Sequence, residues 1–184
     1  CMDRSGVVGA DGPTHHGVFD LSFMSTLPGM IVSAPKDGDE LRNLIATALN
    51  SKKNFSIRYP KDTSRKYNEK KSAEILQIGT WEILHTGAES AILAVGSMVG
   101  MILDAKNEIY SELGYLPTII NARFIKPLDV EMLIDICKSH TNIITIEEGV
   151  LSGGFGSSIS SFLHDYQLNN KLHRLGIPDD FVEH

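Results

Sequence analysis

The stretch that decides the fold and function of this chain is DRSGVVGADGPTHHG, residues 3–17. It sets one arginine, two aspartates and two histidines among glycine and proline residues, which favour turns. Glycines let the backbone take positive φ angles and approach a ligand closely, and loops on a rigid scaffold commonly carry binding groups. Composition alone fits two interpretations equally well, a binding loop or a long surface loop of turn residues.

The bulk composition is that of an ordinary globular protein. The chain has 184 residues, 42% hydrophobic and 22% charged, which suits one large domain or two small ones. A net charge of -6 opposes general binding to nucleic acid, which requires a basic face, and docking on an anionic membrane. No apolar run approaches the roughly 20 residues that a membrane-spanning helix needs. We therefore expect neither a nucleic-acid partner nor a membrane partner.

The cysteines and the chain ends indicate the setting of the protein. Two cysteines, Cys1 and Cys137, do not make a disulfide framework, and they favour a reducing compartment. No signal peptide is visible. The chain opens inside a polar loop and stops at His184 without a closing helix, so we expect a segment of a longer polypeptide. A bacterial cytoplasmic location is expected, and a plastid location stays open.

Strand and helix patterns alternate in two blocks. The first block predicts a strand at residues 30–33, a helix capped by Asp37 with Glu40 three residues on, and a strand at 55–59. The apolar stripe of this helix consists of Leu41, Leu44, Ile45, Ala48 and Leu49. Residues 61–71 are basic and polar, and we interpret them as a solvated linker, with Lys61 left open as an anion ligand.

The second block predicts strands at 81–84, 90–95, 119–121 and 142–146, and a helix at about 98–113. Two further helices follow Asp129 and the glycine turn at 153–156. Such alternation predicts an α/β fold with a mostly parallel sheet. Glu147 and Glu148 are neighbours on a strand, so their side chains face opposite sides and do not form one acid–base site.

Residues 3–17, together with Phe19-Asp20-Leu21, resemble the 1-deoxy-D-xylulose-5-phosphate synthase form of the transketolase-type pyrimidine-binding domain. The resemblance continues in family order through residues 30–35, 58–60, 122–129, 147–149, 153–157 and 177–179. It implies the second half of a pyrimidine-binding domain at 1–64, a linker at 65–78 and a transketolase C-terminal-like domain at 79–184. Each domain is expected to hold a mostly parallel sheet flanked by helices.

The resembled family condenses pyruvate with D-glyceraldehyde 3-phosphate to 1-deoxy-D-xylulose 5-phosphate and CO2, the first step of non-mevalonate isoprenoid precursor synthesis. The resemblance implies thiamine diphosphate and Mg2+ as cofactors and a homodimer as the intact enzyme. The family's activating glutamate, its ring-stacking aromatic residue and its diphosphate-binding domain would lie upstream of Cys1. We therefore expect the 184-residue chain by itself to be inactive.

The resemblance also assigns candidate site residues. Arg4 is a candidate phosphate ligand, since a guanidinium offers a planar fork of donors; its structural alternative is pairing with Asp3 or Asp11. Arg58 and Lys61 form a second candidate pair. The family places a phosphate-binding arginine in this short stretch, and Lys61 stands where relatives carry arginine, so either residue is open.

The remaining candidates are Asp11 and His15. Asp11 would accept a hydrogen bond from a substrate hydroxyl, or hold the loop as an Asx-turn residue. His15 would donate to, or exchange a proton with, the forming alkoxide, because imidazole does both near neutral pH. For His16 we expect a structural role, because neighbouring side chains usually point in different directions.

The sequence leaves three alternative functions open. A transketolase would follow the loop histidine with Gln-Pro and an acidic residue, whereas this chain has HGVFD at 16–20. The β subunit of a 2-oxoacid dehydrogenase shares the RFIKPLD-like segment at 123–129 and lacks the histidine loop. A non-catalytic module that binds a partner or a sugar phosphate is the alternative from another class.

Overall fold

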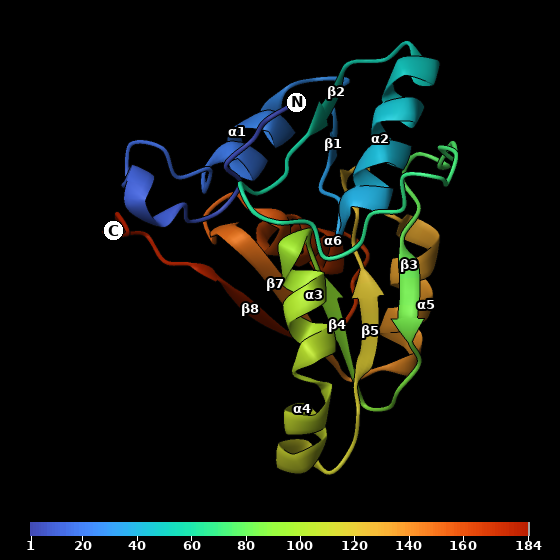
Figure 1. The fold of residues 1–184 in the computed structure, drawn as a ribbon. Helices are drawn as coiled ribbons and strands as arrows, with labels where there is room; N and C mark the ends of the chain where they lie inside the picture. The colour runs from blue at the N-terminus through green and yellow to red at the C-terminus, as the bar shows by residue number, and fades with distance from the viewer. Residues whose placement is uncertain (184) are drawn as a thin grey trace.

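The computed structural model describes residues 1–183 and contains fifteen helices and strands over that range (Figure 1). In chain order they are η1 (Gly9–Asp11), α1 (Asp20–Thr26), β1 (Ile31–Ser33), α2 (Gly38–Ser51), β2 (Phe55–Ile57), β3 (Glu82–His85), β4 (Ser90–Ala94), α3 (Ser97–Asp104), α4 (Lys106–Leu113), β5 (Thr118–Asn121), β6 (Phe124–Lys126), α5 (Val130–Ser139), β7 (Asn142–Val150), α6 (Phe155–Asp165) and β8 (Lys171–Ile177). His184 lies outside the described residues.

A small sheet with strand order β2-β1-β6 forms the first block. β1 and β2 are parallel, with Ile31 opposite Phe55, and β6 runs antiparallel to β1. β6 comes from the second block of the sequence, between β5 and α5, so one edge of the first sheet is built by residues far along the chain. Helices α1 and α2 lie on either side of the β1–β2 pair in Figure 1.

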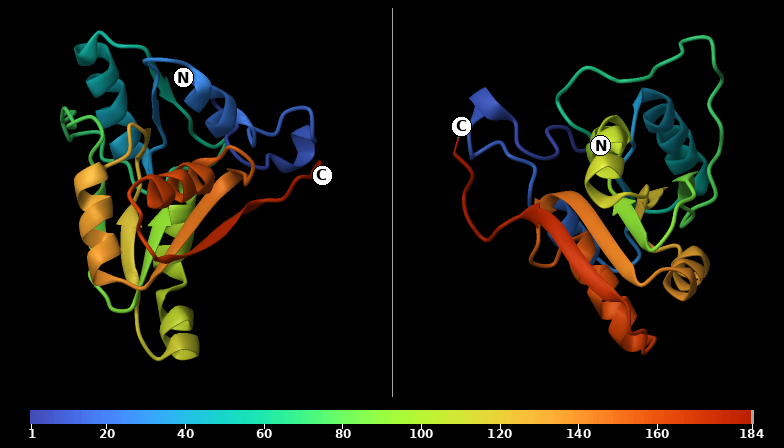
Figure 2. Two further views of the ribbon diagram at one scale, coloured as in Figure 1. Left: turned by 180° about the vertical axis from the view of Figure 1, so that it is seen from behind. Right: turned by 90° about the horizontal axis from the view of Figure 1, so that it is seen from below.

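A larger sheet with strand order β3-β5-β4-β7-β8 forms the second block. β4, β5, β7 and β8 are parallel, and β3 runs antiparallel to β5 at the edge. α3 covers one face, and α5 and α6 cover the other (Figures 1 and 2). The predicted α/β class with a mostly parallel sheet is confirmed for this block, because β–α–β crossovers bring consecutive strands into one direction.

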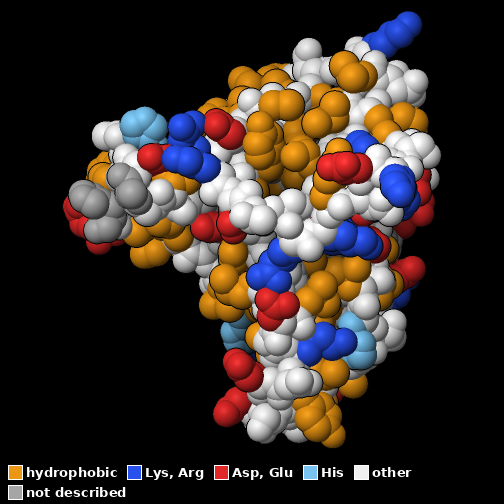
Figure 3. All heavy atoms as spheres, viewed as in Figure 1, with side chains coloured by type: hydrophobic (Ala, Val, Ile, Leu, Met, Phe, Trp, Pro, Cys, Tyr) orange, Lys and Arg blue, Asp and Glu red, His pale blue; other side chains and the backbone are white. Residues whose placement is uncertain are grey.

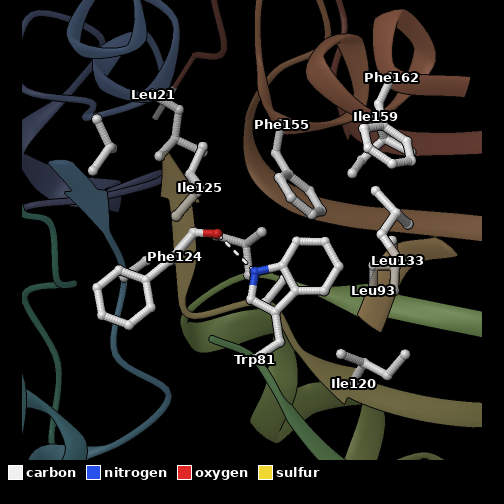
Figure 4. Packing of buried hydrophobic residues seen from close by; sticks show 14 of the residues in the cluster. Leu21, Trp81, Leu93, Ile120, Phe124, Ile125, Leu133, Phe155, Ile159 and Phe162 are labelled. Atoms are coloured by element: carbon white, nitrogen blue, oxygen red, sulfur yellow. Dashed lines mark hydrogen bonds between the residues drawn. The ribbon is translucent and has the colours of Figure 1, made fainter. Parts of the chain in front are cut away.

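One hydrophobic cluster runs through both blocks (Figure 4). Trp81 is buried near its centre: its indole Nε1 donates to the Phe124 carbonyl at 2.8 Å, and its ring packs edge-on against Phe155 at a centroid distance of 5.8 Å. Phe124 in turn packs edge-on against Phe55 of the first sheet at 6.2 Å. A buried indole that keeps its N–H hydrogen-bonded contributes apolar area without an unsatisfied donor.

Helix α2 corrects one prediction about buried faces. Leu44 is fully buried, but Ile45 is 39% exposed and Leu49 is 80% exposed, so the predicted stripe is only partly right. The polar residues Asn43 and Thr47 are buried instead, because their side chains accept hydrogen bonds from the backbone N–H groups of Glu74 and Leu76. Residues 74–76 thus cover a polar strip of α2, and part of its apolar stripe stays exposed to solvent.

Two further expectations about local structure have clear outcomes. The single helix predicted at 98–113 is wrong: α3 and α4 are separate helices that meet at Ala105, whose ψ is 1°. Residues 61–75 are all exposed, as a solvated linker requires.

Over the part of the chain that is described, no helix has both the length and the apolar character needed to cross a membrane.

Candidate functional site

The polar loop at residues 3–17 lies across the end of β2. The Met2 N–H donates to the Ile57 carbonyl at 2.8 Å, and the Ser5 N–H donates to the Tyr59 carbonyl at 3.0 Å. The loop also closes on itself, since the Gly17 N–H donates to the Arg4 carbonyl at 2.9 Å. A Cβ at position 17 would meet that carbonyl oxygen at 2.3 Å, so this crossing requires glycine.

Three predicted site residues meet at one point, which we call the Arg4–Asp11–Lys61 cluster. Asp11 Oδ2 accepts from Arg4 Nε at 3.2 Å and from Lys61 Nζ at 2.7 Å. Arg4 also donates from Nη1 to Asp3 at 2.9 Å. In Figure 3, basic, acidic and histidine side chains gather on the lobe at the left of the view, over the N-terminal loop.

The cluster keeps its carboxylate ionised and leaves hydrogen-bonding capacity for a ligand. The hydrogen bond from Lys61, followed by that from Arg4, holds the pKa of Asp11 below its ordinary value. Among the described contacts, Arg4 uses Nε and Nη1, and Lys61 uses one donor. The second Nη group of Arg4 and the other ammonium protons of Lys61 can therefore turn to an anion.

Arg4 has an unusual backbone conformation. Its φ is +58°, in the left-handed region that non-glycine residues rarely occupy. Such a conformation costs about 1–2 kcal/mol and persists where surrounding contacts impose it. Here the neighbouring Ser5–Tyr59 and Gly17–Arg4 hydrogen bonds impose it, and the guanidinium is turned toward Asp11.

The two loop histidines have different surroundings. His15 is exposed, and its Nδ1 lies 3.0 Å from the Thr14 hydroxyl, so its Nε2 stays open to solvent. His16 is half-buried; its Nδ1 accepts from the Val8 N–H at 3.1 Å, and its Nε2 lies 3.0 Å from the Val182 carbonyl. An acceptor Nδ1 assigns the proton to Nε2, which donates to Val182. His16 therefore ties the loop to the C-terminal segment, the structural role expected for it.

Arg58, the other residue of the second candidate pair, lies inside the protein. Its side chain is 4% exposed; Nε donates to Asp20 at 2.8 Å, and Nη2 donates to the carbonyls of Gly17 and Glu148 at 2.9 and 3.1 Å. It joins the loop, α1 and β7 from within. Lys61, which follows Pro60 beyond the strand, has a side chain 56% exposed and faces the loop.

The end of β7 supports the same loop from the second block. Glu147 is buried and accepts from the N–H groups of Phe155 and Gly156 at 2.8 and 2.7 Å, so it caps α6. Burial raises its pKa against the effect of these two hydrogen bonds. Glu148 faces the other way and accepts from the Val7 N–H at 3.0 Å and from the Ser97 hydroxyl at 3.0 Å. The prediction that these carboxylates face opposite sides is confirmed.

Two observations bear on which ligands the predicted site residues bind. Within residues 1–183, no group of three or more His, Cys, Asp or Glu side chains is arranged to bind a metal ion. A cavity of about 280 Å³ lies between the blocks, lined by the starts of α2 and α3, by Tyr59 and Pro60, and by linker residues. Its lining contains none of the predicted site residues, which lie on the loop and at positions 58 and 61.

Sequence comparisons identify the two halves of the chain. The transketolase pyrimidine binding domain family matches residues 1–66, and the transketolase C-terminal domain family matches residues 79–184. The chain is 48% identical over 185 residues to 1-deoxy-D-xylulose-5-phosphate synthase of Dehalococcoides mccartyi strain CBDB1, which covers 100% of this chain and 28% of that protein. The enzyme of the same name from Dictyoglomus turgidum is 44% identical over 182 residues, covering 99% of this chain and 29% of its own length.

Solved structures support the fold. A split gene transketolase, solved as an inactive β4 tetramer, has a TM-score of 0.83 at 24% identity and covers 97% of this chain and 57% of its own. The transketolase of Campylobacter jejuni has a TM-score of 0.70 at 21% identity and covers 98% of this chain and 27% of its own. The arrangement of both blocks is that of the corresponding transketolase domains, and the chain spans just over a quarter of the curated relatives' length.

Proposed function

The chain belongs to the transketolase family, and from that premise we propose that it carries the acceptor-binding side of a 1-deoxy-D-xylulose-5-phosphate synthase active site. The proposed reaction condenses pyruvate with D-glyceraldehyde 3-phosphate to give 1-deoxy-D-xylulose 5-phosphate and CO2. The observation that carries the proposal is the convergence of Arg4 and Lys61 on Asp11, in a loop that also carries the exposed imidazole of His15. Support from sequence is the 44–48% identity to synthases of that name over nearly the whole chain.

In this proposal, Arg4 and Lys61 bind the phosphate of the acceptor aldehyde. Arg4 supplies a fork of charged donors, and Lys61 supplies a compact point charge. Asp11 holds both cations toward one place through Oδ2, which prepares them before the ligand arrives. Charge-assisted hydrogen bonds of this kind are about twice as strong as neutral ones.

Asp11 Oδ1 and His15 Nε2 then address the rest of the acceptor. The second carboxylate oxygen of Asp11 accepts the hydroxyl of the aldehyde substrate. His15 donates a proton from Nε2 to the oxygen that becomes an alkoxide, with the Thr14 hydroxyl accepting from or donating to Nδ1 as the tautomer changes. An exposed ring on the loop that carries Arg4 and Asp11 suits proton delivery to a bound substrate.

For the second phosphate ligand we propose Lys61 in place of Arg58. The guanidinium of Arg58 is buried and already donates to Asp20 and to two backbone carbonyls. Withdrawing those donors for a ligand would leave a buried carboxylate unpaired, which is costly. We assign Arg58 to holding the loop.

Thiamine diphosphate is the cofactor that the family relationship implies, and it supplies the two-carbon unit as a stabilised carbanion. We place the ligands of its diphosphate and Mg2+ outside the acceptor cluster; within residues 1–183, no three or more His, Cys, Asp or Glu side chains are grouped to bind a metal ion. We therefore derive only the acceptor side from this chain. A homodimer as the intact assembly and inactivity of the 184-residue chain alone are parts of the same proposal.

The experiment uses the product of the complete open reading frame that contains these residues. With thiamine diphosphate and Mg2+, pyruvate and glyceraldehyde 3-phosphate should yield CO2 and the deoxy sugar phosphate in equal amounts. Ketol transfer from xylulose 5-phosphate without pyruvate would make the protein a transketolase and overturn the proposal. Turnover by the isolated 184-residue chain would contradict the predicted inactivity.

Arg4→Ala tests the cluster in the active protein. Losing a charge-assisted phosphate contact should weaken acceptor binding by about 1.5–3 kcal/mol, and the KM for pyruvate should change little. The control is Arg65→Ala, which removes a partly exposed arginine of the linker that pairs with Asp104, away from the loop. An equal loss for both substrates in Arg4→Ala would indicate a structural role.

A further inference from the structure

The second block contributes to the acceptor site through Glu148, although none of the sequence patterns assigns it a role there. Its carboxylate bridges two elements: Oε1 accepts from the Val7 N–H in the loop, and Oε2 accepts from the Ser97 hydroxyl at the start of α3. Glu148 and Val7 are 141 positions apart in the sequence. A carboxylate that accepts a loop N–H and is itself fixed by a hydroxyl is a rigid anchor.

Gly6 makes the contact closer than any other residue would allow. Its φ is +79°, and a Cβ built on it would lie 2.0 Å from the carboxyl carbon of Glu148. The loop backbone therefore lies directly against the carboxylate. Arg4 lies two residues before Gly6, so this contact fixes the position of the loop backbone that carries the phosphate-binding guanidinium.

The main chain of β7 strengthens the same junction. The Glu148 carbonyl accepts from Arg58 Nη2 at 3.1 Å, and the Val150 N–H donates to the Val18 carbonyl at 2.8 Å. The C-terminal end of the loop is thus held by the end of β7, directly at Val18 and through Arg58 at Gly17. Displacing the side-chain anchor alone leaves these backbone contacts in place, so the loop should shift locally and the fold should persist.

We infer that Glu148 is a positioning residue for the acceptor site, holding the 3–17 loop so that Arg4 faces the phosphate of the acceptor and Asp11 faces its hydroxyl. This inference rests on the proposed function. It gives the C-terminal block a direct part in substrate selection, through a hydrogen bond to a loop that belongs to the other block.

The first arm of the test measures the loop without using activity. Hydrogen exchange of the Val7 amide, followed by NMR or mass spectrometry, should accelerate about tenfold in Glu148→Ala because its acceptor is removed. Glu148→Gln should stay within about threefold of wild type, because its carbonyl oxygen still accepts from Val7 and its amide donates to Ser97. Unchanged exchange in Glu148→Ala would overturn the inference.

The second arm measures selectivity in the product of the complete open reading frame. Glu148→Ala should raise the KM for glyceraldehyde 3-phosphate about tenfold, with the KM for pyruvate and kcat within about twofold of wild type, and Glu148→Gln should largely restore it. Gly6→Ala pushes on the same contact from the loop side and should give the same selective rise. Equal effects on both substrates would overturn the inference.

Glu147→Gln is the matched control. Glu147 accepts two backbone N–H groups at the start of α6, and a glutamine would turn an NH2 group toward one of them. This variant should lower thermal stability and leave the ratio of the two KM values unchanged. If Arg4→Ala is acceptor-selective and Glu148→Ala is not, only this inference fails; if neither is selective, the proposed function fails with it.

Discussion

Replacing Arg58 with alanine tests whether this arginine holds the fold while Lys61 faces the ligand. The guanidinium pairs with Asp20, and both side chains are 4% exposed. Asp20 would keep one other described contact, from the Leu21 N–H at 2.8 Å. The carbonyls of Gly17 and Glu148 would lose their shared donor at the same time.

The expected cost follows from burial of the pair. Removing one member of a buried ion pair costs about 3–5 kcal/mol, because the partner stays buried and charged. Lys61→Ala, in contrast, should change stability by less than about 1 kcal/mol, since Lys61 is 56% exposed and its pair with Asp11 is screened by solvent. The cost of about 3–5 kcal/mol expected for Arg58→Ala is a large share of the roughly 5–15 kcal/mol that stabilises a typical domain.

The measurement is urea unfolding followed by Trp81 fluorescence and far-UV circular dichroism, for wild type, Arg58→Ala and Lys61→Ala. Because Arg58→Ala risks complete unfolding, Arg58→Lys and Asp20→Asn supply milder steps, and Asp20→Asn/Arg58→Ala closes a double-mutant cycle. A change of less than 1 kcal/mol in Arg58→Ala, together with a larger loss in Lys61→Ala, would refute the assignment of the two roles.

Three further predictions concern other parts of the chain. Asp37→Ala should cost about 1 kcal/mol in urea unfolding, because the Asp37 carboxylate caps α2 by accepting from the Glu40 N–H at 2.8 Å. A thiol reagent such as dithionitrobenzoate should modify the exposed Cys1 at once and Cys137 only on unfolding, because burial raises the pKa of the Cys137 thiol to about 11; rapid modification of both in the folded chain would contradict this. The pairing of Asp11 should stabilise the loop at neutral pH and fade as the pH falls below the ordinary carboxyl pKa of 3.8 toward the lowered folded value; an NMR titration of Asp11 should give a midpoint below 3.8 that moves upward in Lys61→Ala.

The sequence carries most of the local structure of the loop, because glycine chemistry acts locally. Gly6 and Gly12 take φ angles of +79° and +75°, which only glycine adopts readily. The capping of α2 was also predictable, since the Asp37–Glu40 spacing acts within one turn. In the structure the Glu40 carboxylate accepts from the Lys36 N–H, one residue before the cap, and reaches Asn121 in the second block.

Pairings between distant residues were not predictable from one sequence. The choice between Arg58 and Lys61 depends on Asp20, which lies 38 positions before Arg58 and reaches it only through the fold. The sequence pattern does not predict strand β8, residues KLHRLGI, because edge strands tolerate polar residues. Leu175 on this strand is 54% exposed. Likewise, the sequence does not connect Glu148 with its partners Val7 and Ser97, which come from two other parts of the chain.

Because the second block contributes β6 to the first sheet, the boundary between the two blocks in the sequence is not their boundary in space. β6 completes the first sheet from beyond the exposed linker, and Lys126 at its end donates to the carbonyls of Ser25 and Leu27 at the C-terminal end of α1. A protease that cuts within residues 65–75 would therefore nick the protein without releasing two halves, because the C-terminal piece holds β6, the strand that pairs with β1 of the N-terminal piece. The nicked protein would migrate as one particle until denaturant parts the pieces, and a shortened chain that stops at the linker would expose an unpaired β1 edge.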